Sequence, residues 1–440
     1  MGFTPLRIVS STAFPKKTNK LSGDLLKLNA LEQAMSDGAH GEAARWGIEY
    51  QQRVGTFFDA EDFAPVRLIH ISSDRETIGD SGIAFLRELA ELPPDQRKPR
   101  AFAAADFRGF DEETFKFLLP GRDLAAQSEE AVEALADLGV AASHAYINDH
   151  SVTPPAFGEA CGYSGTPSVI YMNSLVGARC NFEAGPSSLA AFFTGRVPRY
   201  GFHLEESRRA THAYRLDFSP RDVAEWGAVG AIIGRELNSY WSVPAIEIPD
   251  KSTAILSLNH MALNLASYGS IAMFHVIGVT PEAPDWDTAF GKPAPNPTVL
   301  TQAEVLDFLD SWGGVGEKLD VVALSTPQLT ITELVEIAEI LDGHRVHDDT
   351  ALLVYAPQEI KAAAERIGVK QRIEAAGGRL VHGHDFFATF AKEIRESHDW
   401  DRLMTHSVKV ANICAGYGYR PRAASIEQCV KSAIAGKVLP

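Results

Sequence analysis

The last third of the chain alternates between short apolar runs and segments with helical periodicity. The apolar runs are "LDVVALS", "TALLVYA" and "GRLVH", and the helix-like segments between them are "TITELVEIAEIL" and "PQEIKAAAERIGVKQRIEAAG". Strands that alternate with helices in this way form mostly parallel sheets whose faces are covered by the helices. The sequence therefore predicts an α/β fold for this part of the chain.

The N-terminal part has the same organisation. "APVRLIHIS" is typical of a buried strand, and Ser72 and Ser73 separate it from the helix-like "TIGDSGIAFLRELAEL". We expect further strands at "PRAFAAADF" and "PSVIYM", with a helix at "SEEAVEALADLGV" between them. Residues 28–50 predict two short helices broken at Gly38, whereas residues 1–27 are polar and basic and are expected to be an extension.

The middle of the chain predicts helices that pack closely. "DVAEWGAVGAIIGRELN" and "ILSLNHMALNLASYG" are rich in alanine and glycine, "IAMFHVIGV" is typical of a buried strand, and the Pro-rich "TPEAPDWDTAFGKPAPNPTVL" predicts a loop. Beyond the extension we expect lobes at residues 28–215, 216–300 and 301–440. The chain contains no internal repeat.

Charge and cysteine content exclude several classes of protein. The net charge of -16 disfavours a nucleic-acid partner, because phosphates require a basic surface. No run of about 18 apolar residues and no signal peptide is found, so we expect no membrane span. The four cysteines form no CxxC pair, which favours a reduced, cytoplasmic protein. Walker, GxGxxG and GxSxG motifs are missing, so nucleotide binding and hydrolase chemistry have no support.

The stretch "NSLVGARCNFEAGPSS", residues 173–188, lies between an apolar run and the helix-like "LAAFFTG". Ligands of parallel sheets bind at such strand-to-helix junctions. Ser187 and Ser188 can present backbone N–H groups to an anion at the helix N-terminus, and Arg179 can add a bidentate contact. The same residues also fit a plain helix start, with Pro186 in the first turn and Arg179 on a surface loop.

Other polar residues could contribute to a site. His70, Ser72 and Ser73 end the first predicted strand, where they either line a pocket or cap the next helix. Lys409 in "THSVKVAN" is either an anion ligand or a solvated lysine. Imidazole and carboxylate metal ligands could come from "SHAYINDH" and "HGHD", although neither has HExxH spacing.

Taken together, these segments resemble the large catalytic part of aconitase X, a branch of the aconitase superfamily. The resemblance runs from about Leu28 almost to the end of the chain. It is carried by "DGAHGEAARWGIEY", "HISSDRETIGDSGIAFLRELA", "FGEACGYSGTPSVIYMNSLVGARCNFEAGPSSLAAFFTGRVPRYGFHLEESRRATH", "AMFHVIGVTPEAPDWDTAFG", "DVVALSTPQLTITELVEIAEIL" and the closing "THSVKVAN" and "SIEQCVKSAIAGKV".

The resemblance implies an aconitase-like multi-lobe α/β fold with mostly parallel sheets flanked by helices. It also implies a hydro-lyase that dehydrates a small hydroxy acid, such as cis-3-hydroxy-L-proline or mevalonate 5-phosphate. Members of the family need a small swivelling domain, fused or separate. For this chain we expect a separate small subunit, with the active site between the two.

The resemblance also assigns roles to the candidate residues. A substrate carboxylate is expected on Arg179, Ser187 and Ser188. Residues expected to orient or enclose the substrate are Asn173, Ser174, Asn181, His70 and Ser407. Ser72, Ser73 and Lys409 are expected to take part in catalysis, and the proton-abstracting base is expected from the small subunit.

The chain departs from the family at the iron–sulfur cluster, which three cysteines hold. The corresponding positions fall near His144, on Thr326 and on or near Asp385, and Cys180 is not one of them. Because cluster iron requires mainly thiolate ligands, two alternatives stay open. Either His144 with His384 or Asp385 binds one divalent metal, or no metal is bound and a general acid protonates the leaving hydroxide.

Two further functions fit the same departure. The chain could be a cluster-free isomerase or lyase acting on another small carboxylate. It could also be a non-catalytic subunit that binds a metabolite or supports its partner.

Overall fold

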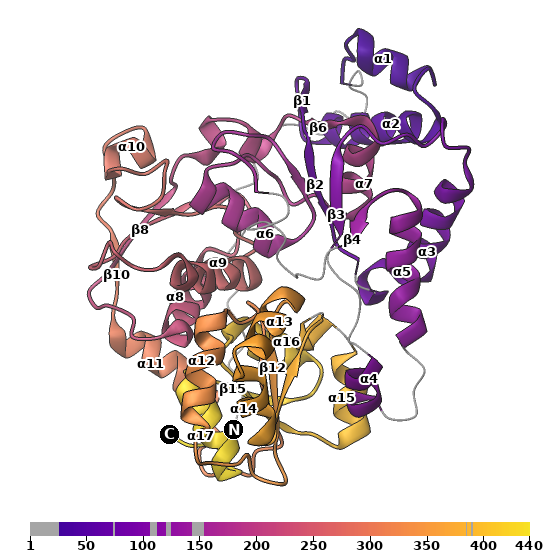
Figure 1. Cartoon of the computed structure of the whole chain (residues 1–440). Coiled ribbons are helices and arrows are strands. Elements are labelled where there is room, and N and C mark those ends of the chain that lie inside the picture. Colours follow the sequence, from indigo (N-terminus) through magenta and orange to yellow (C-terminus); the bar gives the residue numbers. More distant parts are fainter. Residues whose placement is uncertain are drawn as a thin grey trace, which may run out of the picture.

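The computed structural model describes residues 26–73, 75–105, 112–119, 125–142, 154–383, 385–388 and 390–440. The described helices and strands form three lobes (Figure 1). The N-terminal lobe lies at the upper right of Figure 1, the middle lobe at the left and the C-terminal lobe at the bottom.

The N-terminal lobe is built on a four-stranded parallel sheet in the order β4-β3-β2-β5. Its strands are β2 (Leu68–Ile71), β3 (Phe102–Ala105), β4 (Ala141–Ala142) and β5 (Gly162–Tyr163). A small antiparallel pair joins β1 (Phe63–Pro65) to β6 (Arg196–Pro198). The helical segments are α1 (Ala30–Ser36), α2 (Glu42–Phe57), α3 (Arg75–Glu91), α4 (Glu112–Leu118), α5 (Ala125–Asp137), α6 (Thr166–Tyr171), η2 (Met172–Val176), α7 (Gly185–Thr194), η3 (Gly201–His203) and η4 (Glu206–Arg208).

The middle lobe has a second parallel sheet, in the order β10-β7-β8-β9. Its strands are β7 (His212–Leu216), β8 (Pro244–Glu247), β9 (His275–Val276) and β10 (Thr298–Leu300), and its helices are α8 (Val223–Leu237), α9 (Ile255–Gly269), α10 (Trp286–Phe290) and α11 (Gln302–Asp310). Helices α8 and α9 pack at close range because Gly230 and Gly269 leave no side chain between the two backbones.

The C-terminal lobe has a five-stranded parallel sheet in the order β13-β12-β11-β14-β15. Its strands are β11 (Val321–Leu324), β12 (Ala351–Tyr355), β13 (Gly378–Val381), β14 (Arg402–Thr405) and β15 (Arg420–Ala423). Its helices are α12 (Ile331–Ile340), α13 (Gln358–Arg366), α14 (Val369–Ala375), η5 (Phe386–Ala388), α15 (Ala391–His398), α16 (Val408–Gly416) and α17 (Ile426–Ala435). Along β11, Val322 and Leu324 enter one apolar core while Val321 and Ala323 enter another, so helices cover both faces of this sheet.

Helix α4 leaves the N-terminal lobe and lies beside α15 of the C-terminal lobe (Figure 1). Phe115 and Leu118 are buried in the same apolar cluster as Leu403. The Nε2 atom of His398 lies 3.0 Å from the carbonyl oxygens of both Phe117 and Leu118. Because carbonyl oxygens only accept hydrogen bonds, Nε2 carries the proton here and closes the end of α4. This segment ties the first lobe to the third.

The predicted α/β organisation with mostly parallel sheets is confirmed, but several local predictions are wrong. The Pro-rich segment at residues 280–300, predicted as a loop, contains helix α10 and strand β10. "PSVIYM" is not a strand, because Pro167 starts helix α6, which continues into the π-helix η2. A short run buried on all sides has no periodicity to separate strand from helix. The segment predicted as one helix after β12 is two, because Gly368 adopts a left-handed conformation (φ 78°) between α13 and α14.

The "IAMFHVIGV" segment is buried as predicted, but only His275 and Val276 form a strand. Before these two residues, side chains from η2 make the hydrogen bonds that a neighbouring strand would otherwise make. The Asn173 amide donates to the Ala272 carbonyl (3.0 Å), and Ser174 Oγ accepts from the Phe274 N–H (2.9 Å). The middle lobe is thus fixed to η2 of the first.

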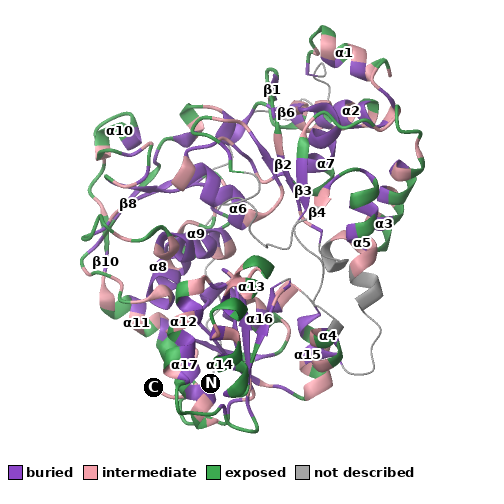
Figure 2. Ribbon diagram, in the orientation of Figure 1, coloured by how far each residue is buried: buried purple, intermediate pink, exposed green. Residues whose placement is uncertain are grey.

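Burial follows the lobe structure. Figure 2 shows α6 and α9 buried on nearly all sides, whereas α1, α3 and α10 carry exposed residues. None of the described helices combines the length and the apolar character that a membrane span requires.

Candidate active site

Candidate residues of the first lobe lie at the carboxyl end of its sheet. His70 is near the end of β2, which Ser72 and Ser73 follow, and Ser164 follows the neighbouring β5. The Ser72 N–H donates to Ser164 Oγ (2.7 Å), which lies 3.1 Å from the His70 carbonyl and 3.2 Å from Ser72 Oγ. The His70 ring is almost fully buried, with Nδ1 3.5 Å from the same hydroxyl. Ser164, which was not among the predicted residues, brings His70 and Ser72 together.

The stretch after η2 folds back on itself through Asn173. Its Oδ1 accepts from the Cys180 N–H (3.0 Å) and its Nδ2 donates to the Cys180 carbonyl (2.8 Å). Gly177 makes this turn with φ 74°, and a Cβ there would meet the Phe157 ring. Asn173 is completely buried, so it fixes the loop that carries Arg179.

Arg208 holds the same loop from the other side. Its guanidinium forms a forked pair with Glu282 (2.7 to 3.0 Å) and donates to the carbonyl oxygens of Asn173 (2.9 Å) and Phe202 (3.0 Å). Charged groups are rarely buried unless they are paired in this way. Arg208 has no local signal in the sequence, because its main partners Asn173 and Glu282 are distant along the chain.

Asn181 is also engaged by the protein. Its Oδ1 accepts from the Phe202 N–H (3.0 Å) and from the Tyr240 hydroxyl (3.1 Å), and its Nδ2 donates to the Tyr200 carbonyl (3.0 Å). These contacts hold Tyr200 and Tyr240 near the Glu183 carboxyl. Burial raises the pKa of both phenols, and the Glu183 carboxyl raises it further. Asn181 therefore shapes the wall around Glu183.

Arg179 lies at the surface edge of this region. One guanidinium nitrogen lies 2.6 Å from Glu205, whose side chain is 72% exposed, and another donates to the His203 carbonyl (3.2 Å). Arg179 itself is only 26% exposed, so its guanidinium is half-covered but already carries a carboxylate partner.

Glu183 is the residue with the most unusual environment in this region. Burial raises the pKa of its carboxyl to about 7, and a hydrogen bond from Ser187 acts in the opposite direction. Oε1 has no hydrogen-bond partner among the described residues. A carboxyl that is half protonated near neutral pH can give or take a proton. Glu183 is not recognisable as a site residue from the sequence, because the stretch "NFEAGPSS" does not reveal its burial.

Ser187 and Ser188 lie in the first turn of α7, as predicted. Their backbone N–H groups donate to the Ala184 carbonyl at 2.8 and 3.1 Å, and Ser188 Oγ donates to the Gly185 carbonyl. These amides are therefore used inside the helix start. The Ser187 hydroxyl lies near the Glu183 carboxyl and lowers its pKa.

In the C-terminal lobe, Ser407 and Lys409 lie at the carboxyl end of β14. Ser407 caps α16 by accepting from the Val410 N–H (3.3 Å). Lys409 is 6% exposed, and its Nζ lies 5.3 Å from the centre of the Phe387 ring. A buried ammonium group in the first turn of a helix adds to the positive field that attracts an anion.

The neighbouring strand end, after β11, carries Ser325 and Thr326. Ser325 Oγ donates to Asp385 Oδ1 (3.2 Å) and accepts from the Phe386 N–H (3.2 Å). The side chains of Ser325, Thr326 and Asp385 are completely buried. His144 and His384, the other predicted metal ligands, lie outside the described residues.

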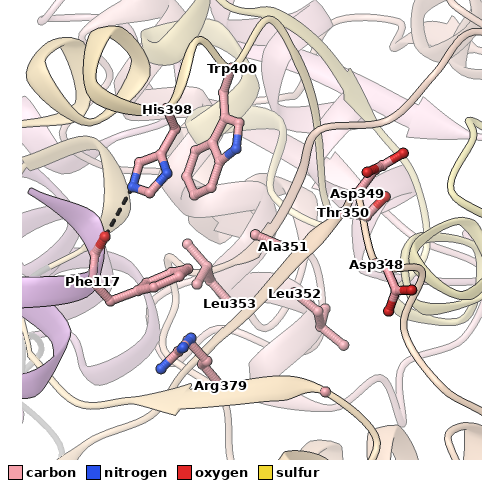
Figure 3. A pocket seen from close by; sticks show the side chains of 11 residues that line it. Phe117, Asp348, Asp349, Thr350, Ala351, Leu352, Leu353, Arg379, His398 and Trp400 are labelled. Atoms are coloured by element: carbon pink, nitrogen blue, oxygen red, sulfur yellow. Dashed lines mark hydrogen bonds between the residues drawn. The ribbon is translucent and has the colours of Figure 1, made fainter. Parts of the chain in front are cut away.

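A surface pocket of about 320 Å³ lies elsewhere in the same lobe (Figure 3). Figure 3 shows Phe117, His398 and Trp400 on one side and Asp348 on the other, with Arg379 below Phe117. These residues surround the amino end of β12, whereas the candidate residues follow the carboxyl ends of the strands. The pocket is thus not the candidate active site.

Sequence comparisons cover nearly the whole chain. Models of the first, second and third domains of aconitase X match residues 25–206, 210–309 and 319–435 in turn. A cis-3-hydroxy-L-proline dehydratase of Pseudomonas aeruginosa is 31% identical over 93% of this chain and 70% of that protein. A phosphomevalonate dehydratase large subunit of Thermococcus kodakarensis is 26% identical over 91% of this chain and 98% of that protein.

The fold is also found in a solved structure. The crystal structure of aconitase X from Thermococcus kodakaraensis superimposes with a TM-score of 0.79, at 24% sequence identity, over 93% of this chain and 100% of that one. The shared arrangement of lobes agrees with the domain matches.

Proposed function

The chain belongs to the aconitase X family and is a dehydratase, and from this premise we propose that it removes water from a small hydroxy acid such as cis-3-hydroxy-L-proline. The Pseudomonas relative with that name is 31% identical. The observation that carries the proposal is the buried Glu183 carboxyl, whose pKa of about 7 suits it to proton transfer.

We propose that the substrate carboxylate binds to Lys409 at the start of α16. Its ammonium group is nearly buried, and the helix dipole adds to its attraction. Arg179, Ser187, Ser188 and Ser407 remain proposed neighbours of the substrate. Fixing the carboxylate first stabilises the enolate-like charge that develops when the adjacent carbon loses its proton.

The protonated Glu183 carboxyl then acts as the general acid. A base removes the proton from the carbon beside the carboxylate, and the resulting electron pair forms the carbon–carbon double bond. As the carbon–oxygen bond breaks, Glu183 gives its proton to the hydroxyl, which leaves as water. The hydrogen bond from Ser187 stabilises the Glu183 carboxylate that remains.

We propose that the base comes from a separate small subunit. The Thermococcus relative is named a large subunit, a name that implies a small partner. All four cysteines are unpaired thiols, which supports the proposed cytoplasmic location.

The name of the same relative supports a second candidate, the dehydration of a phosphorylated hydroxy acid such as 5-phosphomevalonate. A substrate panel separates the two. The chain, produced together with a small swivel-type subunit, is incubated with each compound, and the mass loss of one water is followed. We expect turnover of cis-3-hydroxy-L-proline. Turnover of phosphomevalonate alone would replace the first candidate, and no turnover of either compound by the folded pair would favour a binding subunit.

A further inference from the structure

The family's iron–sulfur cluster requires several thiolates at one place, and at most two thiols of this chain lie together, those of Cys161 and Cys180. Cys161 and Cys180 are buried in the first lobe. Cys180 Sγ accepts from the Tyr163 N–H (3.3 Å) and lies 3.1 Å from the Asn181 carbonyl, whereas Cys161 Sγ lies 3.8 Å from the Arg179 carbonyl. The two sulfurs of this pair contact the backbone of the loop that carries Arg179.

The other two cysteines lie in the C-terminal lobe, on opposite sides of its sheet. Cys414 of α16 belongs to the apolar cluster of Val321 and Leu403, and Cys429 of α17 belongs to that of Val322. Both are completely buried. Burial raises the pKa of the Cys180, Cys414 and Cys429 thiols, so the protonated form is favoured over the thiolate that iron needs.

At the family's ligand positions the described residues offer oxygen instead of sulfur. Thr326 and Asp385 are joined through Ser325, whose hydroxyl lies 3.4 Å from Thr326 Oγ1 and donates to Asp385 Oδ1. The Phe386 N–H donates to the same hydroxyl, which fastens η5 to the end of β11. In the part of the chain that the structure describes, no three histidine, cysteine or acidic side chains are grouped as metal ligands. Hydroxyl and carboxylate oxygens are poor ligands for an iron–sulfur cluster.

We propose that this dehydratase holds no iron–sulfur cluster, and that the hydrogen bonds of Ser325 with Asp385 and Phe386 hold the loop after β13 where the family uses a thiolate. The inference concerns the site of the proposed function, but it rests on the donor atoms and not on the substrate. The leaving hydroxyl then needs its proton from a side chain, which is the role proposed for Glu183.

The test is the iron and acid-labile sulfide content of the anaerobically produced chain, alone and with its small subunit. Each sample is measured before and after reconstitution with ferrous iron and sulfide, with a ferredoxin as assay control. We expect substoichiometric sulfide and no visible absorption band in every sample. Stoichiometric iron and sulfide with such a band would overturn the proposal, whereas iron without sulfide would support it.

Two variants make the result specific. Thr326→Val removes the hydroxyl oxygen and Asp385→Asn replaces the carboxylate with a neutral amide, and neither should change the sulfide content of a cluster-free protein. Loss of sulfide in either variant would contradict the proposal by showing that these positions hold a cluster. Sulfide analysis needs no substrate, so a sulfide-free but inactive protein would count against the proposed function and leave this inference standing.

Discussion

Ser325 Oγ donates a hydrogen bond to Asp385 Oδ1 across 3.2 Å, between the ends of two strands of the C-terminal sheet. The same hydroxyl also accepts a hydrogen bond from the Phe386 N–H. The completely buried Ser325 side chain therefore makes two hydrogen bonds. The resemblance to aconitase X implies a cluster cysteine on or near Asp385 and another at Thr326, next to this hydrogen bond. A hydrogen-bonded oxygen network can fix the loop geometry, but it cannot replace the Lewis acid that a cluster would supply.

Replacing Ser325 should therefore destabilise the fold. Ser325→Ala removes a donor from Asp385 and an acceptor from Phe386, and we expect a loss of about 1–3 kcal/mol in the free energy of unfolding. Urea unfolding followed by fluorescence measures it. Ser311→Ala, which removes an exposed hydroxyl bonded to the Phe308 carbonyl, is the matched control and should cost far less. Equal effects of the two substitutions would show that the buried network is unimportant.

Arg208 should be among the most sensitive positions for stability. Arg208→Met leaves Glu282 without its partner and frees the carbonyl oxygens of Asn173 and Phe202. Breaking a buried ion pair typically costs about 3–5 kcal/mol, and we expect a loss in that range. Arg199→Met breaks the exposed pair with Asp62 and should cost less than about 1 kcal/mol. A neutral Arg208→Met would contradict the structural role given to this side chain.

Acid should destabilise the protein through its buried histidines. Burial lowers the pKa of His406 to about 3, and burial with the charges of Arg208 and other arginines does the same for His203. The unfolded chain binds these protons near pH 6.5, so stability is lost as the pH falls from about 6.5 towards 3. Each histidine should contribute about 2 kcal/mol of loss between pH 7 and pH 5.

His406→Leu tests the expected contribution of His406 to the loss of stability in acid. Unfolding curves at several pH values should show a weaker pH dependence in this variant than in the wild type. His344→Leu alters an exposed histidine and should keep the wild-type dependence. A His406→Leu protein with an unchanged pH dependence would mean that His406 does not remain neutral in the fold.

Lys409 and Arg179 differ in how well each can bind a substrate carboxylate. Lys409 is nearly buried in the first turn of a helix, whereas the Arg179 side chain is 26% exposed and its charge is better screened by water. We expect Lys409→Ala to lower kcat/KM by about 10- to 100-fold, the loss typical of a charged hydrogen bond. Arg179→Ala should lower it by less than about fivefold. The reverse order, measured by steady-state kinetics, would return the carboxylate to Arg179.

The sequence predicted those parts of the fold that local patterns decide. The alternation that produces β11 to β13 was clear because both faces of that sheet are covered, which makes each strand a continuous apolar run. "PSVIYM" failed because the same property, burial on all sides, also describes helix α6.

The site residues were harder to predict, because their environment depends on distant partners. Asn173 and Asn181 look like ligand-binding residues in the sequence, but Arg208, Ala272 and Tyr240 occupy their polar atoms. Glu183 gains its high pKa only when the surrounding lobes exclude water from it. Such effects have no local signal.

If Glu183 is the general acid of a dehydratase, the pH dependence of kcat/KM must show its titration. The wild type should lose activity above about pH 7, as the Glu183 carboxyl loses its proton. Ser187→Ala should move this limb to higher pH, because the Ser187 hydrogen bond lowers that pKa. Glu183→Gln should reduce the rate by about 100-fold or more and abolish the limb. A Glu183→Gln enzyme with the wild-type rate and the same limb would contradict the account.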